Sequence, residues 1–307
     1  MTVRLLLALV LCAASSFPGF AQDTSAAEPS ETAGSSEVAT GSNGGSTAST
    51  VADDPSTYPT LSAEELESAA QVENVSVPTP GEFFAAINKI ERPNWSQLDR
   101  PGALSATTSR VRLSLNVGAR VADGFIAVEA QDGQQVRNTG RDIIDLAKGL
   151  GVSESIIARG SSIGDFAENN EWTALKEELE ATENEVKLQM AAQRDEPLVI
   201  LVTIGAWLRG MQAASEVIGT NYSESAAELL RQPAIVEFLV ARLGALPNRM
   251  QEDNVIEEIE AGILEIRKTT DLPAEQTLTE ADVEAINSAT TRLVEFINTA
   301  DSDNPES

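Results

Sequence analysis

Leu198-Val-Ile-Leu-Val-Thr-Ile-Gly-Ala-Trp-Leu208 is the stretch that decides the fold. It carries no charge and a single hydroxyl group, and it forms the first half of an expected helix over 197–218. The side chains are apolar around the whole circumference of that helix, and such a helix is buried inside a larger protein. The sequence therefore predicts that other helices surround this one.

The residues before it predict a second long helix, over 171–193, that folds back on the first. Its apolar side chains recur at spacings of three, four or seven, which is typical of one buried helix face; they are Trp172, Leu175, Leu179, Val186 and Met190. Asn170 stands where a side chain commonly caps the first turn of a helix. We predict a central antiparallel hairpin of these two helices in an all-α, multi-helix bundle of about 9–11 helices.

The flanking sequence supplies the other helices. One begins at a capping box, Thr79-Pro-Gly-Glu82, where a hydroxyl and a carboxylate satisfy orphan backbone N–H groups, and Thr279-Glu-Ala-Asp282 caps the last helix. Gly151 is placed to end another helix in the left-handed conformation. The remaining expected helices cover 62–72, 134–150, 153–169, 223–230, 233–243 and 254–268.

Residues 111–117 are ambiguous. They alternate between apolar and polar side chains, which is the pattern of a half-buried strand. On a helix, however, Val111, Leu115, Gly118 and Ala122 fall in one stripe that continues to later residues. A lone strand would leave its backbone groups unpaired, and no partner strand is evident elsewhere. We therefore predict a helix, in which Gly118 and Ala122 let a neighbouring helix come close.

The N-terminal residues 1–21 predict a signal peptide. A positive start containing Arg4 precedes an apolar run over 5–14, and small residues lead up to a cleavage site after Ala21. The apolar run is too short to span a bilayer. We expect a periplasmic or secreted protein whose mature chain has no transmembrane segment.

The rest of the chain divides by composition. Residues 22–58 are rich in Ser, Thr, Gly and Ala and lack the apolar surface needed for a core, so we expect a disordered tether. Residues 59–300 form the expected helical domain, with an internal boundary near 219–222 as the alternative to a single domain. Residues 301–307 are expected to fray.

Composition excludes several kinds of chemistry. The chain has no histidine, and its one cysteine, Cys12, lies in the expected signal peptide. Zinc, copper and haem sites, and nucleophiles that depend on cysteine or histidine, are therefore excluded from the mature protein. We predict no metal, no cofactor and no catalytic residue. With 48 acidic and 21 basic residues, the net charge of −27 also argues against nucleic-acid binding.

Arg209 is the first candidate site residue, because it follows directly on the apolar stretch. A buried guanidinium must be paired or reach water. One interpretation is an anion-binding residue in a cleft between helices. The other is a structural ion pair with a carboxylate such as Asp123 or Asp145, or a side chain that reaches the surface.

Two further candidate clusters each combine arginine with aspartate. Asn116, Arg120 and Asp123 share one face of the expected helix around 111–126, and Arg137, Arg141 and Asp145 repeat the arrangement on the next helix. If the two faces met, they would form a polar seam able to hold a carboxylate or a phosphate. The alternative is that each strip is a solvated outer face with local pairs.

These features favour a non-enzymatic, exported binding or interaction module of the cell envelope. Its expected partner is an unidentified protein or a small anionic ligand that contacts the seam and Arg209. The first alternative is a hydrolase of cell-wall or polysaccharide material that uses paired carboxylates, for which the glutamates over 177–185 are candidates, although their strongly polar helix face favours a solvated surface. The second is a structural envelope protein without a small ligand.

Overall fold

The computed structural model describes residues 77–90, 93–98, 104–273 and 275–300. All of them belong to one of two units of the chain, the one that spans 60–307. The predictions for 1–21, 22–58, 62–72 and 301–307 lie outside the described residues. The turn at 219–222 lies inside the unit 60–307, between two consecutive helices.

The described residues form helices and connecting turns but no strand, so the prediction of an all-α, multi-helix bundle is confirmed. Residues 111–117 lie inside a helix. The α-helices are α2 (Pro80–Ile90), α3 (Arg110–Glu129), α4 (Gly133–Leu150), α5 (Ser153–Glu168), α6 (Trp172–Ala192), α7 (Glu196–Thr220), α8 (Glu224–Ala227), α9 (Pro233–Gly244), α10 (Asn248–Gln251), α11 (Asn254–Thr270) and α12 (Glu280–Ile297). Two 3-10 turns, η3 (Trp95–Leu98) and η4 (Glu228–Leu230), complete the set.

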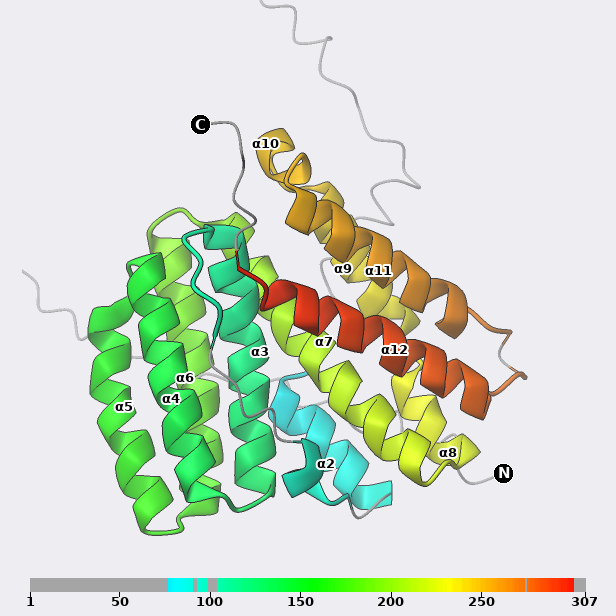
Figure 1. Cartoon of the computed structure of the whole chain (residues 1–307), viewed down its shortest axis with the longest axis horizontal. Coiled ribbons are helices and arrows are strands. Elements are labelled where there is room, and N and C mark those ends of the chain that lie inside the picture. Colours follow the sequence, from blue (N-terminus) through cyan, green and yellow to red (C-terminus); the bar gives the residue numbers. More distant parts are fainter. Residues whose placement is uncertain (1–76, 91–92, 99–103, 274, 301–307) are drawn as a thin grey trace, which may run out of the picture. The chain divides into compact units, whose positions relative to one another are not determined.

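Helix α7 lies between two groups of helices (Figure 1). Helices α3, α4, α5 and α6 pack side by side on one side of it, and α9, α11 and α12 pack together on the other. Helix α7 is buried from both sides, because it is apolar around most of its circumference and exposure of that surface to water is unfavourable. Within the described part of the chain, α7 is the one helix that is long and apolar enough to cross a bilayer. However, 83% of its most apolar 18-residue stretch is buried inside the protein, which is typical of a core helix.

The main partner of α7 is α3, and glycine makes their contact possible. A Cβ atom added to Gly118 of α3 would lie 1.9 Å from the carbonyl oxygen of Val202, and one added to Gly205 of α7 would lie 2.0 Å from that of Leu115. The two backbones therefore touch at this crossing, with no room for a side chain. The expectation that Gly118 admits a neighbouring helix is confirmed.

The hairpin of α6 and α7 exists, but it differs in detail from the prediction. The two helices are consecutive and are joined by a turn in which Arg194 has a φ of 61°. Helix α6 packs chiefly on α5 and α3, so α7 shares the centre of the bundle with α3. Asn170 is not the cap of α6: its φ is 58°, and Glu171 takes the cap position without a side-chain hydrogen bond. Asparagine tolerates the left-handed turn that ends α5 better than most residues do.

Helix α3 is buried around its whole circumference from Val111 to Val128. The sequence pattern predicts a polar face opposite the apolar stripe, and that polar face is buried as well. Its predicted members Asn116, Arg120 and Asp123, together with Arg112 one turn earlier, are each no more than 5% exposed. Buried charges need partners. The partners of these residues define the first of the two sites described below.

Candidate functional site

Arg209 lies in a buried network around α3. Its Nε donates to Oδ1 of Asp123 at 2.7 Å, and its other nitrogens donate to the carbonyl oxygen of Leu98 at 2.5 Å and to Oε1 of Gln212 at 3.2 Å. Only 1% of Arg209 is exposed. Of the two interpretations from the sequence, the structure shows the ion pair, and the partner is Asp123 rather than Asp145.

Arg120 extends this network to α4. It lies 3.1 Å from Asp123 and 3.4 Å from Asp142, whereas Asp145 points outward and pairs with Lys148 at 2.6 Å. Burial raises the pKa of the Asp142 carboxyl above its ordinary value, the nearby Arg120 opposes that rise, and the charges of Asp123 and Asp145 add to it. The sequence analysis named Asp145 as the candidate carboxylate of α4. The carboxylate that lies near Arg120 is instead Asp142, about one helical turn earlier.

The predicted seam between the two polar faces does not form. Arg137 and Arg141 hydrogen-bond to Gln134 and Asn138 of their own helix instead of facing α3. Helix α4 turns its apolar residues onto the core, so the polar residues opposite them must face solvent. The structure therefore brings Asn116, Arg120, Asp123 and Arg209 around α3 and leaves Arg137, Arg141 and Asp145 outside.

The other end of the polar face holds the end of α12. Asn116 donates to the carbonyl oxygen of Ile297 at 3.1 Å, and Arg112 donates to that of Phe296 at 2.5 Å and to the hydroxyl of Thr299 at 3.0 Å. The last carbonyl groups of a helix have no partner within it and carry partial negative charge, which these side chains satisfy. The network thus fastens Leu98, α7 and α12 to α3, which is an architectural role.

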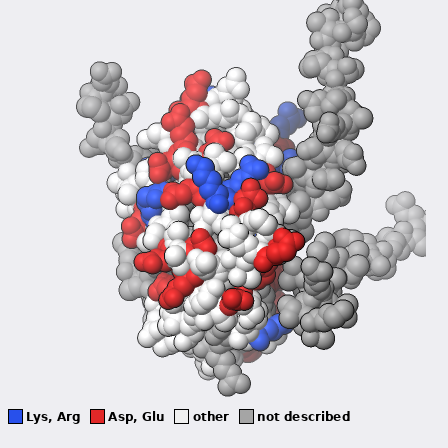
Figure 2. All heavy atoms as spheres, turned by 90° about the vertical axis from the view of Figure 1, so that its right-hand side faces the viewer, with Lys and Arg blue, Asp and Glu red and all other residues white. Residues whose placement is uncertain are grey.

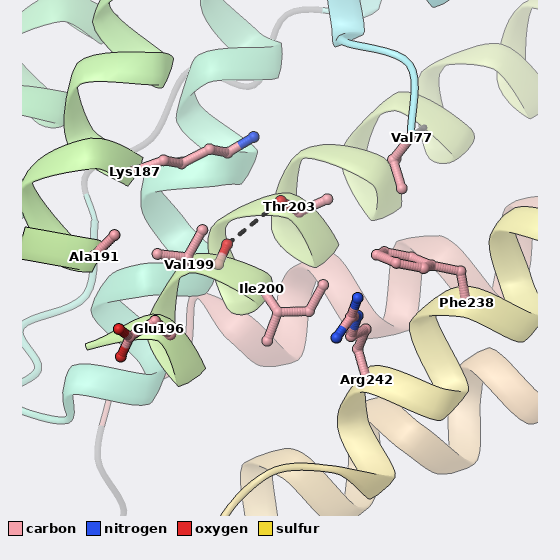
Figure 3. A pocket seen from close by; sticks show the side chains of 9 residues that line it. All are labelled: Val77, Lys187, Ala191, Glu196, Val199, Ile200, Thr203, Phe238 and Arg242. Atoms are coloured by element: carbon pink, nitrogen blue, oxygen red, sulfur yellow. Dashed lines mark hydrogen bonds between the residues drawn. The ribbon is translucent and has the colours of Figure 1, made fainter. Parts of the chain in front are cut away.

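A separate hollow lies between α6, α7 and α9 (Figure 3). Its volume is about 400 Å³, which is within the range of small-molecule sites. Most of its lining is apolar, and the polar groups are few. The lining residues are Val77, Lys187, Ala191, Glu196, Val199, Ile200, Thr203, Phe238 and Arg242. We call this hollow the α6/α7/α9 groove.

Arg242 is one of two cations in the lining of the groove. Its guanidinium carbon lies 5.1 Å from the centroid of the Phe238 ring, and both side chains extend toward Ile200 (Figure 3). Among the described residues Arg242 has no carboxylate partner. Phe238 and Arg242 are four residues apart and so share one face of α9, a spacing that is visible in the sequence.

Lys187 is the second cation of the groove, and it is paired with a carboxylate that does not line the groove. Its Nζ lies 2.6 Å from Oε1 of Glu183, a carboxylate that is 4% exposed. The other oxygen of Glu183 is buried and has no hydrogen-bond partner among the described residues. Thr203, at the floor, donates to the carbonyl oxygen of Val199 in its own helix, and the only carboxylate in the lining is Glu196.

Two of the glutamates over 177–185 are paired with basic side chains. Glu178 pairs with Arg159 at 3.1 Å, and Glu183 pairs with Lys187. Burial and the neighbouring carboxylates Glu82, Glu183 and Glu177 raise the pKa of Glu180, and none of these residues except Lys187 lines the groove. Within the described part of the chain, no group of acidic residues is arranged to hold a metal ion.

Acidic side chains lie among uncharged ones on the surface of the described residues (Figure 2). Figure 2 shows one face on which they are widely spread, with fewer basic side chains among them. Several of the basic residues in the group α9, α11 and α12 are paired across helices: Arg292 lies 2.6 Å from Glu265, and Arg267 lies 3.3 Å from Glu237. Among these arginines, Arg242 differs in that it faces an apolar hollow and has no carboxylate partner within the described residues.

None of the protein-family models, curated proteins or solved structures compared with this chain matches it. Function is therefore inferred from the geometry and charge of the α6/α7/α9 groove.

Proposed function

We propose that this protein is an exported, non-catalytic binding module that holds a small anionic amphiphile in the α6/α7/α9 groove. The observation that carries the proposal is Arg242, whose guanidinium stands at an apolar hollow with an aromatic ring as its only neighbouring partner among the described residues. The proposal keeps the anionic ligand expected from the sequence and moves it from Arg209 to Arg242.

The lining favours a ligand with one negative head and an apolar body. A guanidinium binds a carboxylate or a phosphate through parallel N–H donors, which gives both strength and orientation. Val199, Ile200 and Phe238 offer apolar surface to the remainder of the ligand. Glu196 lies in the same lining and would repel a second negative charge, so a monoanion fits better than a dianion.

The location in the proposal rests on the sequence of residues 1–21. A positive start, a short apolar run and small residues before Ala21 are typical of a cleaved export signal. The measurement is N-terminal sequencing of the protein from the fractionated source cell. A chain that begins at Gln22 in the periplasm or the medium supports export, and an uncleaved chain in the cytoplasm contradicts it.

Binding is tested by calorimetry with decanoate as the anionic amphiphile and decanol as its neutral analogue. Decanoate should bind and decanol should bind much more weakly, because only the carboxylate uses Arg242. Arg242→Gln should weaken decanoate binding roughly tenfold, which is the loss expected for one charge-assisted hydrogen bond.

The matched control is Arg249→Gln. Arg249 is an exposed arginine of the neighbouring helix α10 and does not line the groove, so its loss lowers the net charge equally without touching the site. Equal weakening by both variants would show that decanoate responds to overall charge only. No binding of decanoate by the unmodified protein would contradict the proposed ligand class.

A further inference from the structure

The lining of the α6/α7/α9 groove contains three charged side chains, and one of them is already neutralised. Lys187 lies 2.6 Å from Glu183, a carboxylate that is 4% exposed. An unpaired charge is costly at such a buried position, so Glu183 keeps Lys187 as its partner. Arg242 and Glu196 remain as one positive and one negative group that a ligand can contact.

Glu196 and Arg242 project from different helices toward the same apolar floor (Figure 3). Glu196 stands four residues before Ile200 on α7, a rise of about 6 Å, and Arg242 extends from α9 toward Ile200. No ion pair joins Glu196 to Arg242 within the described part of the chain. The two opposite charges are therefore held apart on either side of an apolar side chain.

This arrangement complements a head group that carries both charges. A carboxylate can bind Arg242 while an ammonium group on the neighbouring carbon atom faces Glu196, so that each charge of the protein meets its opposite. With ion pairs of up to about 4 Å on each side, such a head spans protein charges on the order of 10 Å apart. A separation of this order is expected for side chains about one turn apart on helices whose axes lie 8–10 Å apart.

The remainder of the groove suits an apolar chain. Val77, Val199 and Phe238 add apolar surface beside Ile200. The volume of about 400 Å³ also exceeds the space that the head group alone requires. The groove therefore has room for a hydrocarbon chain attached to the head.

We infer that the ligand carries an ammonium group beside its carboxylate, so that the α6/α7/α9 groove binds an α-amino acid with an apolar side chain. Glu196 selects the ammonium group, and Arg242 binds the carboxylate. The inference rests on the proposed function, in which Arg242 already binds the anionic head, and it adds a specificity-determining role for Glu196.

The test compares decanoate, 2-aminodecanoate and 2-hydroxydecanoate by calorimetry at pH 7, where the amino group is cationic. The three ligands share one hydrocarbon chain and one carboxylate, and they differ only in the substituent on the second carbon atom. The unmodified protein should bind 2-aminodecanoate about threefold more tightly than either of the others, which is the gain expected for one solvent-exposed ion pair.

Glu196→Gln is the decisive variant. It should weaken the binding of 2-aminodecanoate about threefold and leave that of decanoate unchanged or slightly tighter, because Glu196 attracts an ammonium group and repels a carboxylate. A general loss of folding would instead weaken both ligands. The matched control is Glu252→Gln, at an exposed position outside the groove, which should leave the ratio of the two affinities unchanged.

The outcomes separate the inference from the proposed function. If decanoate binds through Arg242 but 2-aminodecanoate binds no more tightly, or keeps its advantage in Glu196→Gln, the inference is overturned and the proposed function stands. If only 2-aminodecanoate binds, and both Arg242→Gln and Glu196→Gln weaken it, the inference is supported and the ammonium group is required. Failure of all three ligands to bind would overturn both.

Discussion

Arg209 and Arg242 make an instructive comparison, since both lie on largely apolar helices of the same protein. Arg209 is 1% exposed, and its nitrogens meet Asp123, Leu98 and Gln212. Arg242 is only partly buried, and its guanidinium lies over the ring of Phe238. The first arginine has its hydrogen bonds made by the fold, and the second has N–H donors that a ligand can use.

The difference follows from the cost of desolvating a charge. A guanidinium that is fully removed from water is tolerated only where the folded protein supplies a carboxylate and carbonyl groups around it. Such a residue is committed to the structure. A guanidinium at the edge of a hollow keeps contact with water in the absence of a ligand, so its partner can be exchanged. Burial therefore separates the structural arginine from the candidate binding arginine.

The largest effect is expected when Arg209, the buried structural arginine, is replaced. Arg209→Leu should lower the free energy of unfolding by about 3–5 kcal/mol, because it removes the cation 2.7 Å from a carboxylate that is 5% exposed. Arg242→Leu should change it by no more than about 0.5 kcal/mol. Urea unfolding at neutral pH measures both.

In the Arg209→Leu variant Asp123 keeps Arg120 at 3.1 Å, so the expected loss comes from one missing partner of a shared carboxylate and from the carbonyl oxygen of Leu98 left without its donor. Equal destabilisation by Arg209→Leu and Arg242→Leu would contradict the distinction drawn between the two residues.

The second effect concerns the α3–α7 crossing that holds the network in place. Gly118→Ala should cost about 3 kcal/mol, because the new Cβ would lie 1.9 Å from a backbone oxygen and the two helices must move apart. The control is Gly164→Ala in α5, where a new Cβ meets nothing within 4 Å. That variant should be stabilised by about 0.5–1 kcal/mol. Thermal unfolding of the pair measures the contrast, and similar melting temperatures would refute the close crossing.

The smallest effect extends the comparison to carboxylates. Burial and neighbouring glutamates raise the pKa of Glu180 in the folded protein above the ordinary 4.5. Ionised Glu180 therefore destabilises the fold at pH values above its raised pKa, and this cost disappears as the pH falls toward 4.5. Glu180→Gln should accordingly raise stability near pH 7–8 by no more than about 1 kcal/mol, and the gain should shrink at lower pH.

Melting temperatures measured from pH 8 down to pH 4.5 test this prediction. Glu284→Gln, at an exposed position of α12, separates the loss of one negative charge from the relief of burial. A gain that grows as the pH falls would show that the sign is wrong.

Local features of the fold could be predicted from short stretches. The capping box of α12 forms as expected between Thr279 and Asp282, and Gly151 ends α4 with a φ of 78°. Gly118 indicated a close helix contact, although only the structure shows that it lies against the backbone of Val202 and Ala206 in α7. These features depend on residues a few positions apart or on the size of one side chain, so the sequence carries them directly.

The candidate sites could be predicted only in part. Asp123 and Asp145 were the two carboxylates considered as partners of Arg209, and each lies on the polar face of a predicted helix. Only Asp123 pairs with Arg209. The choice between Asp142 and Asp145 depends on how α4 is rotated against α3, which periodicity alone defines poorly. The α6/α7/α9 groove is formed by side chains from parts of the chain as distant as Val77 and Arg242, and no local pattern joins them.

The sequence by itself determined that this protein is built from helices, that the helix expected over 197–218 is buried, and that the chain contains no histidine. Only the tertiary structure decided that α3 is the main partner of α7, that Arg209 is hydrogen-bonded within a buried network, and that Arg242 faces a hollow. The reason is the range of the interactions. Helix periodicity and capping act within a few residues, whereas the burial of a polar face depends on which distant helix covers it.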